Sequence, residues 1–127
     1  MMKKEAIVSN NAPEAVGPYS QAIRINDFIF LSGQLGIDPQ TKKLVDGGVE
    51  AQAGQIFKNM TAVLAAAGAG LSQVVKATVF LKEMADFKRV NEVYAQAFEK
   101  PYPARSAFAV KELPLGADIE IEAIAHL

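Results

Sequence analysis

The chain has 127 residues, half of them hydrophobic, which is enough to bury one core and excludes a disordered protein. Its 13 Lys and Arg against 14 Asp and Glu leave a formal charge of −1, so no whole-chain field attracts nucleic-acid phosphates or anionic lipid. We therefore expect one domain over residues 1–127, and we expect no nucleic-acid partner.

The residue types that are missing exclude several chemistries. Cysteine is absent, and His126, next to last, is the only histidine. Disulfides, thiolate nucleophiles, Ser/His arrangements and the common zinc sites are excluded, and we expect no metal. The chain has no run of about 18 apolar residues and no signal-peptide pattern, so we expect a cytoplasmic protein without a membrane partner.

The N-terminal quarter predicts short strands separated by turn signals. Residues 5–9 predict a first strand, residues 21–25 alternate in polarity, and residues 28–31 are β-favouring and apolar on both faces. The turn signal Asn26-Asp27 separates the last two runs, which together predict a hairpin.

Two amphipathic helices are predicted in the middle of the chain, after a long connection over residues 34–48 whose length suggests a functional role. The first helix begins near Val49 and ends near Gly68, with apolar residues at helical spacing: Ala53, Ile56, Phe57, Met60, Val63, Leu64 and Ala67. Asp86 is a candidate N-cap for the second helix, which Pro101 ends and whose buried side holds Phe87, Val90, Tyr94, Ala97 and Phe98.

The remaining segments predict strands. Residues 73–81 alternate, with one face formed by Val75, Ala77, Val79 and Leu81, and residues 105–112 and 118–125 predict a closing pair. The order β-β-β-α-β-α-β-β defines an α+β domain with two helices on one face of a sheet. The uncovered face would form a large apolar patch, which predicts a homo-oligomer, from Phe28, Phe30, Phe80, Phe108 and Val110.

Arg105 is the first candidate for chemistry. It begins a predicted strand after the stiff segment Tyr102-Pro103-Ala104, and a guanidinium held there suits fork-like binding of a planar carboxylate. The alternative, an ordinary surface arginine, stays open on this feature alone.

Glu120 and Glu122 share one face of the last strand, opposite Ile119 and Ile121. If that strand is central, at least one acid is partly buried and needs a partner, which suits a proton relay. A solvated edge strand is the alternative. The glycines at 33–36 and 47–48 match no nucleotide-binding motif.

The remaining candidates are small polar residues near element ends, where sites are often built: Tyr19 and Ser20, Ser32 to Gln34, and Asn91. With neighbouring segments they carry a resemblance. The chain resembles the RidA family, also called YjgF/YER057c/UK114, in Asn11-Ala12-Pro13, Gly17-Pro18-Tyr19-Ser20-Gln21-Ala22, Ser32-Gly33-Gln34, residues 75–81, residues 90–94, Pro103-Ala104-Arg105-Ser106 and residues 119–125. This resemblance implies a chorismate-mutase-like fold and a homotrimer with active sites in clefts between subunits.

The resemblance also implies an activity. Family members that keep the arginine hydrolyse 2-aminoacrylate and related 2-imino acids, such as 2-iminobutanoate and 2-iminopropanoate, to 2-keto acids and ammonia. By position, Arg105 would bind the substrate carboxylate, and Glu120 would hold water and move protons. The pocket would be lined by Tyr19, Ser32, Gly33 and Asn91. Hydrolysis of an electrophilic iminium needs an anchor, water and a proton relay, so we expect no cofactor.

The sequence departs from the family pattern at one position, and two functions other than imine hydrolysis stay open. Ala107 stands where many members have Cys. The thiol is therefore missing, but the backbone carbonyl that we expect to contact water at this position is kept. Another title of the family names an endoribonuclease or translation inhibitor. Such a protein would need a basic track, and the chain has no run of Lys and Arg longer than a pair such as Lys42-Lys43. A module that binds 2-keto acids without turnover would use the same arginine, and the sequence does not separate it from the hydrolase.

Overall fold

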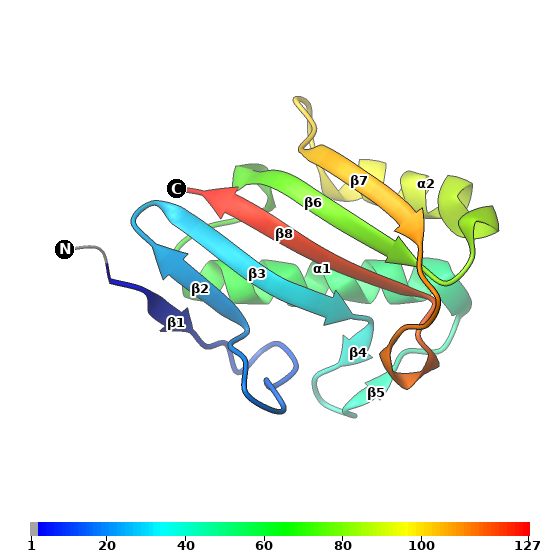
Figure 1. Ribbon diagram of the computed structural model, residues 1–127, viewed down its shortest axis with the longest axis horizontal. Helices are drawn as coiled ribbons and strands as arrows, with labels where there is room; N and C mark the ends of the chain where they lie inside the picture. Colours follow the sequence, from blue (N-terminus) through cyan, green and yellow to red (C-terminus); the bar gives the residue numbers. More distant parts are fainter. Residues whose placement is uncertain (1–2) are drawn as a thin grey trace.

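The computed structural model describes residues 3–127, which form a six-stranded sheet with both helices on one face (Figure 1). In spatial order the strands are β1 (Glu5–Ile7), β2 (Ala22–Ile25), β3 (Phe28–Leu35), β8 (Ile119–His126), β6 (Val74–Leu81) and β7 (Ala104–Ala109). The helices are α1 (Gly48–Ala66) and α2 (Phe87–Ala97), which lie behind the sheet in Figure 1. The predicted α+β architecture is confirmed.

Neighbouring strands pair antiparallel except β6 and β7, which are parallel. A parallel pair needs a crossover, and α2 supplies it. The crossover makes β7 the edge strand beside α2, with Arg105 level with Ala77 of β6. Short 3-10 turns complete the chain: η1 (Leu71–Gln73), η2 (Met84–Asp86) and η3 (Pro114–Gly116).

The hydrophobic core lies between the sheet and the helices. Alternate residues of β8 point into it, and Ile119 and Ile121 are fully buried there. From α1 the core receives Ile56, Met60, Val63 and Leu64. Gly68 ends that helix as predicted, with φ +75° and its N–H bonded to the carbonyl of Ala65. No helix within residues 3–127 is long and apolar enough to cross a membrane.

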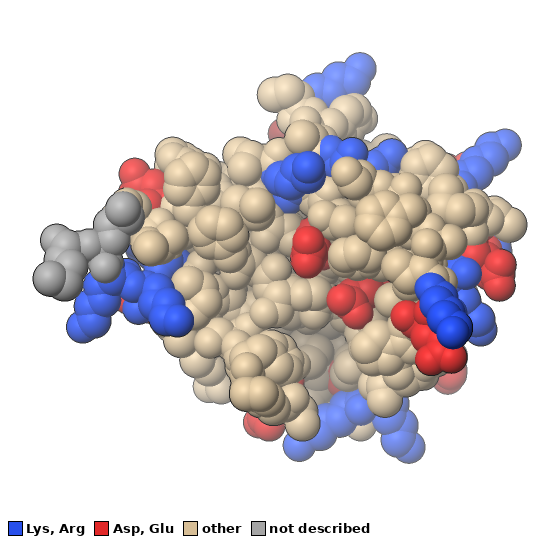
Figure 2. All heavy atoms as spheres, in the orientation of Figure 1, with Lys and Arg blue, Asp and Glu red and all other residues tan. Residues whose placement is uncertain are grey.

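The other face of the sheet has no covering layer. Phe28 and Phe108 remain 43% and 45% exposed, and Phe80 contacts Phe108 edge to face with ring centroids 5.5 Å apart. Figure 2 shows this face, where uncharged residues cover most of the centre and Lys and Arg gather toward the rim. The predicted apolar patch is therefore present, and we call it the open face.

Three local predictions were wrong. Val75 was predicted on the same face as Ala77, but a bulge between Val74 and Lys76 puts the buried Val74 on that face and leaves Val75 46% exposed. The connection over residues 34–48 is not irregular, because β3 runs to Leu35 and β4 (Ile37–Asp38) pairs with β5 (Lys43–Leu44). Residues 105–112 and 118–125 do not form the predicted closing pair, because β7 ends at Ala109 and pairs with β6, which separates it from β8.

The predicted N-cap also differs in its chemistry. Asp86 occupies the N-cap position of α2, but its side chain does not cap the helix. The carboxylate instead pairs with Arg89, which also binds Glu50 of α1. Arg89 thus links α2 to α1 through an exposed ion-pair network.

Gly36 lets β3 and β4 approach α1. A Cβ at this position would lie 2.6 Å from the Cα and 2.7 Å from the backbone oxygen of Gln52. We expect Gly36→Ala to lower the free energy of unfolding by about 1–3 kcal/mol, because helix backbone cannot move aside like a side chain. Gly54→Ala is the control, because a Cβ there meets nothing within 4 Å, and alanine favours a helix by about 1 kcal/mol. Urea unfolding measures both, and a Gly36→Ala protein as stable as wild type would contradict this packing.

Candidate active site

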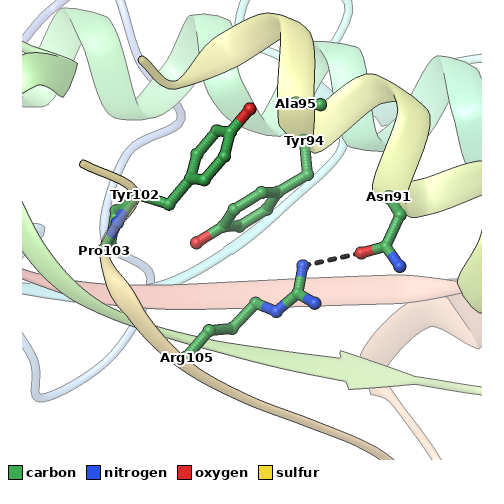
Figure 3. A pocket seen from close by; sticks show the side chains of 6 residues that line it. All are labelled: Asn91, Tyr94, Ala95, Tyr102, Pro103 and Arg105. Atoms are coloured by element: carbon green, nitrogen blue, oxygen red, sulfur yellow. Dashed lines mark hydrogen bonds between the residues drawn. The ribbon is translucent and has the colours of Figure 1, made fainter. Parts of the chain in front are cut away.

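Arg105 points to the helix side of the sheet. Its register partner Ala77 is buried beneath the helices, and the guanidinium packs against α2. Its Cζ lies 4.6 Å from the centre of the Tyr94 ring and 5.1 Å from that of Phe87. Its Nη1 donates a hydrogen bond to Oδ1 of Asn91 over 2.7 Å (Figure 3). Two ring faces and one amide oxygen therefore hold this cation.

These three partners follow from the spacing on α2. Phe87, Asn91 and Tyr94 stand at i, i+4 and i+7, which places them on one side of the helix. None of them carries a negative charge at neutral pH. Within residues 3–127 Arg105 forms no ion pair and makes this single hydrogen bond, although a guanidinium has five N–H donors. The arrangement leaves a partly buried positive charge available to an anion.

A pocket of about 440 Å³ opens beside the guanidinium. It is lined by Asn91, Tyr94, Ala95, Tyr102, Pro103 and Arg105, with Tyr102 and Pro103 on the side opposite Asn91 (Figure 3). The Tyr94 hydroxyl is buried and has no hydrogen-bond partner among the described residues. Burial raises the pKa of Tyr94, with Arg105 acting in the opposite direction, so the phenol stays neutral near pH 7.

Glu120 lies on the open face, since its neighbours Ile119 and Ile121 point into the core. A Cβ on Gly33 would lie 2.2 Å from Oε2 of Glu120, so glycine at this position leaves room for the carboxylate. Partial burial raises the pKa of Glu120, and the negative charge of Glu122 raises it further. The predicted shared face of the two acids is confirmed.

The loop that carries Tyr19 is hydrogen-bonded to β3 beside Gly33. The Ser32 hydroxyl donates to the backbone carbonyl of Ser20 over 2.6 Å, and Gln21 binds both backbone groups of Ser9. Tyr19 itself is 51% exposed, and its hydroxyl accepts a hydrogen bond from the N–H of Val16. Between Leu31 and Gln34 the register with β8 shifts, so Ser32 and Gly33 lie in a bulge.

The candidate residues therefore form two groups. The arginine group, Arg105 and Asn91, faces the helices, whereas the glutamate group, which comprises Ser32, Gly33 and Glu120, lies at the open face. Tyr19 lies in the loop before β2, to which Ser32 is joined through its hydrogen bond to Ser20. Glu120 of β8 pairs with Phe80 of β6, which pairs with Phe108 of β7. Phe108 lies three residues after Arg105, so Arg105 and Glu120 are separated by three residues along the strands and by two strand spacings across the sheet. Strand geometry puts the Cα atoms of Arg105 and Glu120 roughly 14 Å apart, on opposite faces. One copy of the chain does not bring the two groups together.

Three aromatic residues beside Arg105 or its pocket were not predicted as site residues: Phe87, Tyr94 and Tyr102. The sequence placed the first two in the core, which is also true of Tyr94 at 5% exposure. Their helical spacing from Asn91 was the available signal. Within residues 3–127 no group of three or more metal-ligating side chains occurs.

A half-buried arginine and a half-buried glutamate stand on a two-helix α+β sheet, and comparisons with known proteins identify the family. The model for the family described as Endoribonuclease L-PSP matches residues 9–127. Reactive Intermediate Deaminase A, chloroplastic, of Arabidopsis thaliana is 54% identical over 126 residues, which is 99% of this chain and 67% of that protein. The chain belongs to this family, the RidA family.

Two further relatives show how close the match is. The 2-iminobutanoate/2-iminopropanoate deaminase of Homo sapiens is 48% identical over 122 residues, covering 96% of this chain and 89% of that protein. The crystal structure of RidA from the Antarctic bacterium Psychrobacter sp. PAMC 21119 superimposes with a TM-score of 0.94 at 45% identity, covering 97% of this chain and 99% of that one. The fold predicted from the resemblance is confirmed.

The raised pKa of Glu120 has a consequence for stability. A carboxyl with a higher pKa when folded destabilises the fold above that pKa, and the penalty disappears as the pH falls through it toward the ordinary value. We expect Glu120→Gln to be as stable as wild type or slightly more stable at pH 7, with the difference vanishing near pH 4. Thermal midpoints at both pH values measure this, and a variant less stable at pH 7 would show that the ionised carboxylate has a stabilising partner.

Proposed function

We propose that this protein hydrolyses 2-aminoacrylate and related 2-imino acids, such as 2-iminobutanoate and 2-iminopropanoate, to 2-keto acids and ammonia. The observation that carries the proposal is Arg105, a partly buried guanidinium with only uncharged partners among residues 3–127. A substrate carboxylate supplies the charge that the site lacks. The names of the plant and human relatives support the reaction.

The two groups divide the chemistry. Arg105 anchors the substrate carboxylate and Asn91 fixes the Nη1 end of the guanidinium. Glu120 accepts a proton from water as the water oxygen bonds to C2 of the iminium. The carbinolamine that forms takes that proton on nitrogen, and the C–N bond breaks as the hydroxyl proton passes to Glu120. The ammonia that leaves carries this proton away as ammonium, so Glu120 is regenerated and the 2-keto acid is released. An enamine substrate first receives a proton at C3, which converts it to the iminium.

The pKa of Glu120 suits this exchange. A carboxyl whose pKa is raised by burial and by Glu122 is a stronger base than an exposed one and takes a proton from water more easily. Gly33 keeps space beside the carboxylate, and its N–H is a candidate donor to the substrate. We assign Ser32 and Tyr19 to the wall of the same pocket.

The separation of the two groups calls for a second copy of the chain. A substrate carboxylate on Arg105 of one copy meets Glu120 when the open face of the next copy packs against the β7 edge. The open face carries the exposed rings of Phe28, Phe30 and Phe108, which such packing would bury. We therefore propose a homotrimer with each site shared between two subunits.

The assembly gives a direct measurement. Light scattering at micromolar concentration should give about 40 kDa, three times the chain mass of 13.6 kDa. Phe108→Glu should reduce that mass, because it puts an acidic group into the apolar contact. Lys3→Glu, at an exposed position outside the sheet, is the control and should leave the mass unchanged. A wild-type monomer would contradict the shared site.

Arg105 provides the central mutational test. Arg105→Lys keeps the charge but loses the fork, and Arg105→Ala loses both, so both variants should lower kcat/KM at least about a hundredfold. The assay generates 2-iminobutanoate in situ and follows keto-acid release. Arg89→Ala is the matched control, because this exposed α2-side arginine binds Glu50 and Asp86 instead. Unchanged thermal midpoints separate loss of the anchor from loss of the fold, and a fully active Arg105→Ala protein would contradict the assignment.

The ribonuclease named in the family description makes a different prediction. RNA cleavage needs a cationic track along the backbone, but the net charge is −1 and the open face shows its Lys and Arg at the rim (Figure 2). We expect no cleavage under single-turnover conditions with nuclease-free protein. Cleavage that travels with the protein through purification and disappears in Arg105→Ala would overturn this expectation.

A further inference from the structure

The Arg105 guanidinium is surrounded by aromatic carbon rather than by carboxylates. Tyr94 lies 4.6 Å from Cζ and Phe87 lies 5.1 Å from it, both measured to the ring centre. Both rings come from α2, which also supplies Asn91 to the Nη1 end (Figure 3). Such ring faces attract a cation through their quadrupole and leave its N–H edge free.

We propose that Tyr94, together with Phe87, is a positioning residue that uses its ring face to hold Arg105 in the orientation that receives the substrate carboxylate. The inference rests on the proposed function, since it concerns how that anchor is built. Neither residue touches the substrate in this scheme. They act through the arginine alone.

The chemistry of the holder matters. An aspartate or glutamate beside Arg105 would fix the side chain equally well, but it would neutralise the charge and compete with the substrate carboxylate. A neutral ring and an amide oxygen restrict the side chain without occupying its charge. The long arginine side chain would otherwise lose rotamer freedom at the moment of binding, which weakens affinity.

The Tyr94 ring is held rigidly by the core. Tyr94 is 5% exposed, and its ring packs against Phe57 and Phe98 with centroid distances of 6.0 and 4.7 Å. One side of Tyr94 thus belongs to the core while the other carries the cation. The core fixes the ring, and the ring fixes the arginine.

The ring face, and not the hydroxyl, makes the contact with Arg105. The hydroxyl has no hydrogen-bond partner within residues 3–127, so removing it leaves no protein group unpaired. Tyr94→Phe keeps the ring and should bind a 2-keto acid within about twofold of wild type. Tyr94→Leu removes the ring and should weaken binding about tenfold, as expected for loss of a partly desolvated cation–π contact.

The experiment measures the dissociation constant of 2-oxobutanoate, the product of 2-iminobutanoate hydrolysis, by NMR titration, together with kcat and KM for the imino acid. The Tyr94→Leu loss should appear mainly in Kd and KM. Val90→Ala is the matched control, because it destabilises the same helix from a fully buried position and removes neither a ring nor a hydrogen-bonding group from Arg105. Phe87→Leu, at a half-buried position, gives the second test if Tyr94→Leu does not fold, and it too should weaken binding.

A readout without ligand separates this inference from the proposed function. The Nε–Hε signal of Arg105 should shift in Tyr94→Leu, since the ring current is lost, and remain near its wild-type position in Val90→Ala. Unchanged binding and an unchanged signal in Tyr94→Leu would overturn the inference, as would equal losses in Tyr94→Phe and Tyr94→Leu. If Arg105→Ala binds 2-oxobutanoate as well as wild type, the proposed function itself fails and the positioning role falls with it.

Discussion

The charge of Arg105 is held in place without being neutralised, and the rest of the account depends on this arrangement. A partly buried guanidinium normally pairs with a carboxylate, and even the exposed Arg89 of α2 binds two of them. Arg105 instead meets the rings of Phe87 and Tyr94 and the amide of Asn91. The missing counter-charge is what the proposed substrate carboxylate would supply.

The fold explains how this anchor arises from the chain. The crossover through α2 makes β6 and β7 parallel, so the residue that follows Pro103 and Ala104 arrives directly under the helix that has just been formed. In the same helix layer, Gln52 of α1 binds both the N–H and the carboxylate of Asp118. These two hydrogen bonds fix the start of β8, two residues before Glu120. Both helices lie on one face of the sheet (Figure 1), and each positions the strand residue from which one functional group projects, Arg105 toward the helices and Glu120 toward the open face.

Much of this could be predicted from the sequence, for identifiable reasons. Strict alternation placed Glu120 and Glu122 opposite Ile119 and Ile121, because a central strand with one buried face permits only one register. Val75 was misplaced because a bulge changes the alternation without a signal in the residue types. The contact between Tyr94 and Arg105 could not be predicted, because a tyrosine at a buried helical position reads as core whether or not its outer face meets a cation. The division of the site between two faces also required the strand order, which periodicity does not supply.

The most direct test of the account is subunit complementation. Arg105→Ala and Glu120→Gln should each be nearly inactive, and each keeps the group that the other lacks. If every site takes Arg105 from one copy and Glu120 from the next, trimers reassembled from an equal mixture should regain activity in about one quarter of their sites. Recovery toward that level is the predicted result. Mixed trimers of the correct mass that stay as inactive as the two parents would contradict a site shared between subunits.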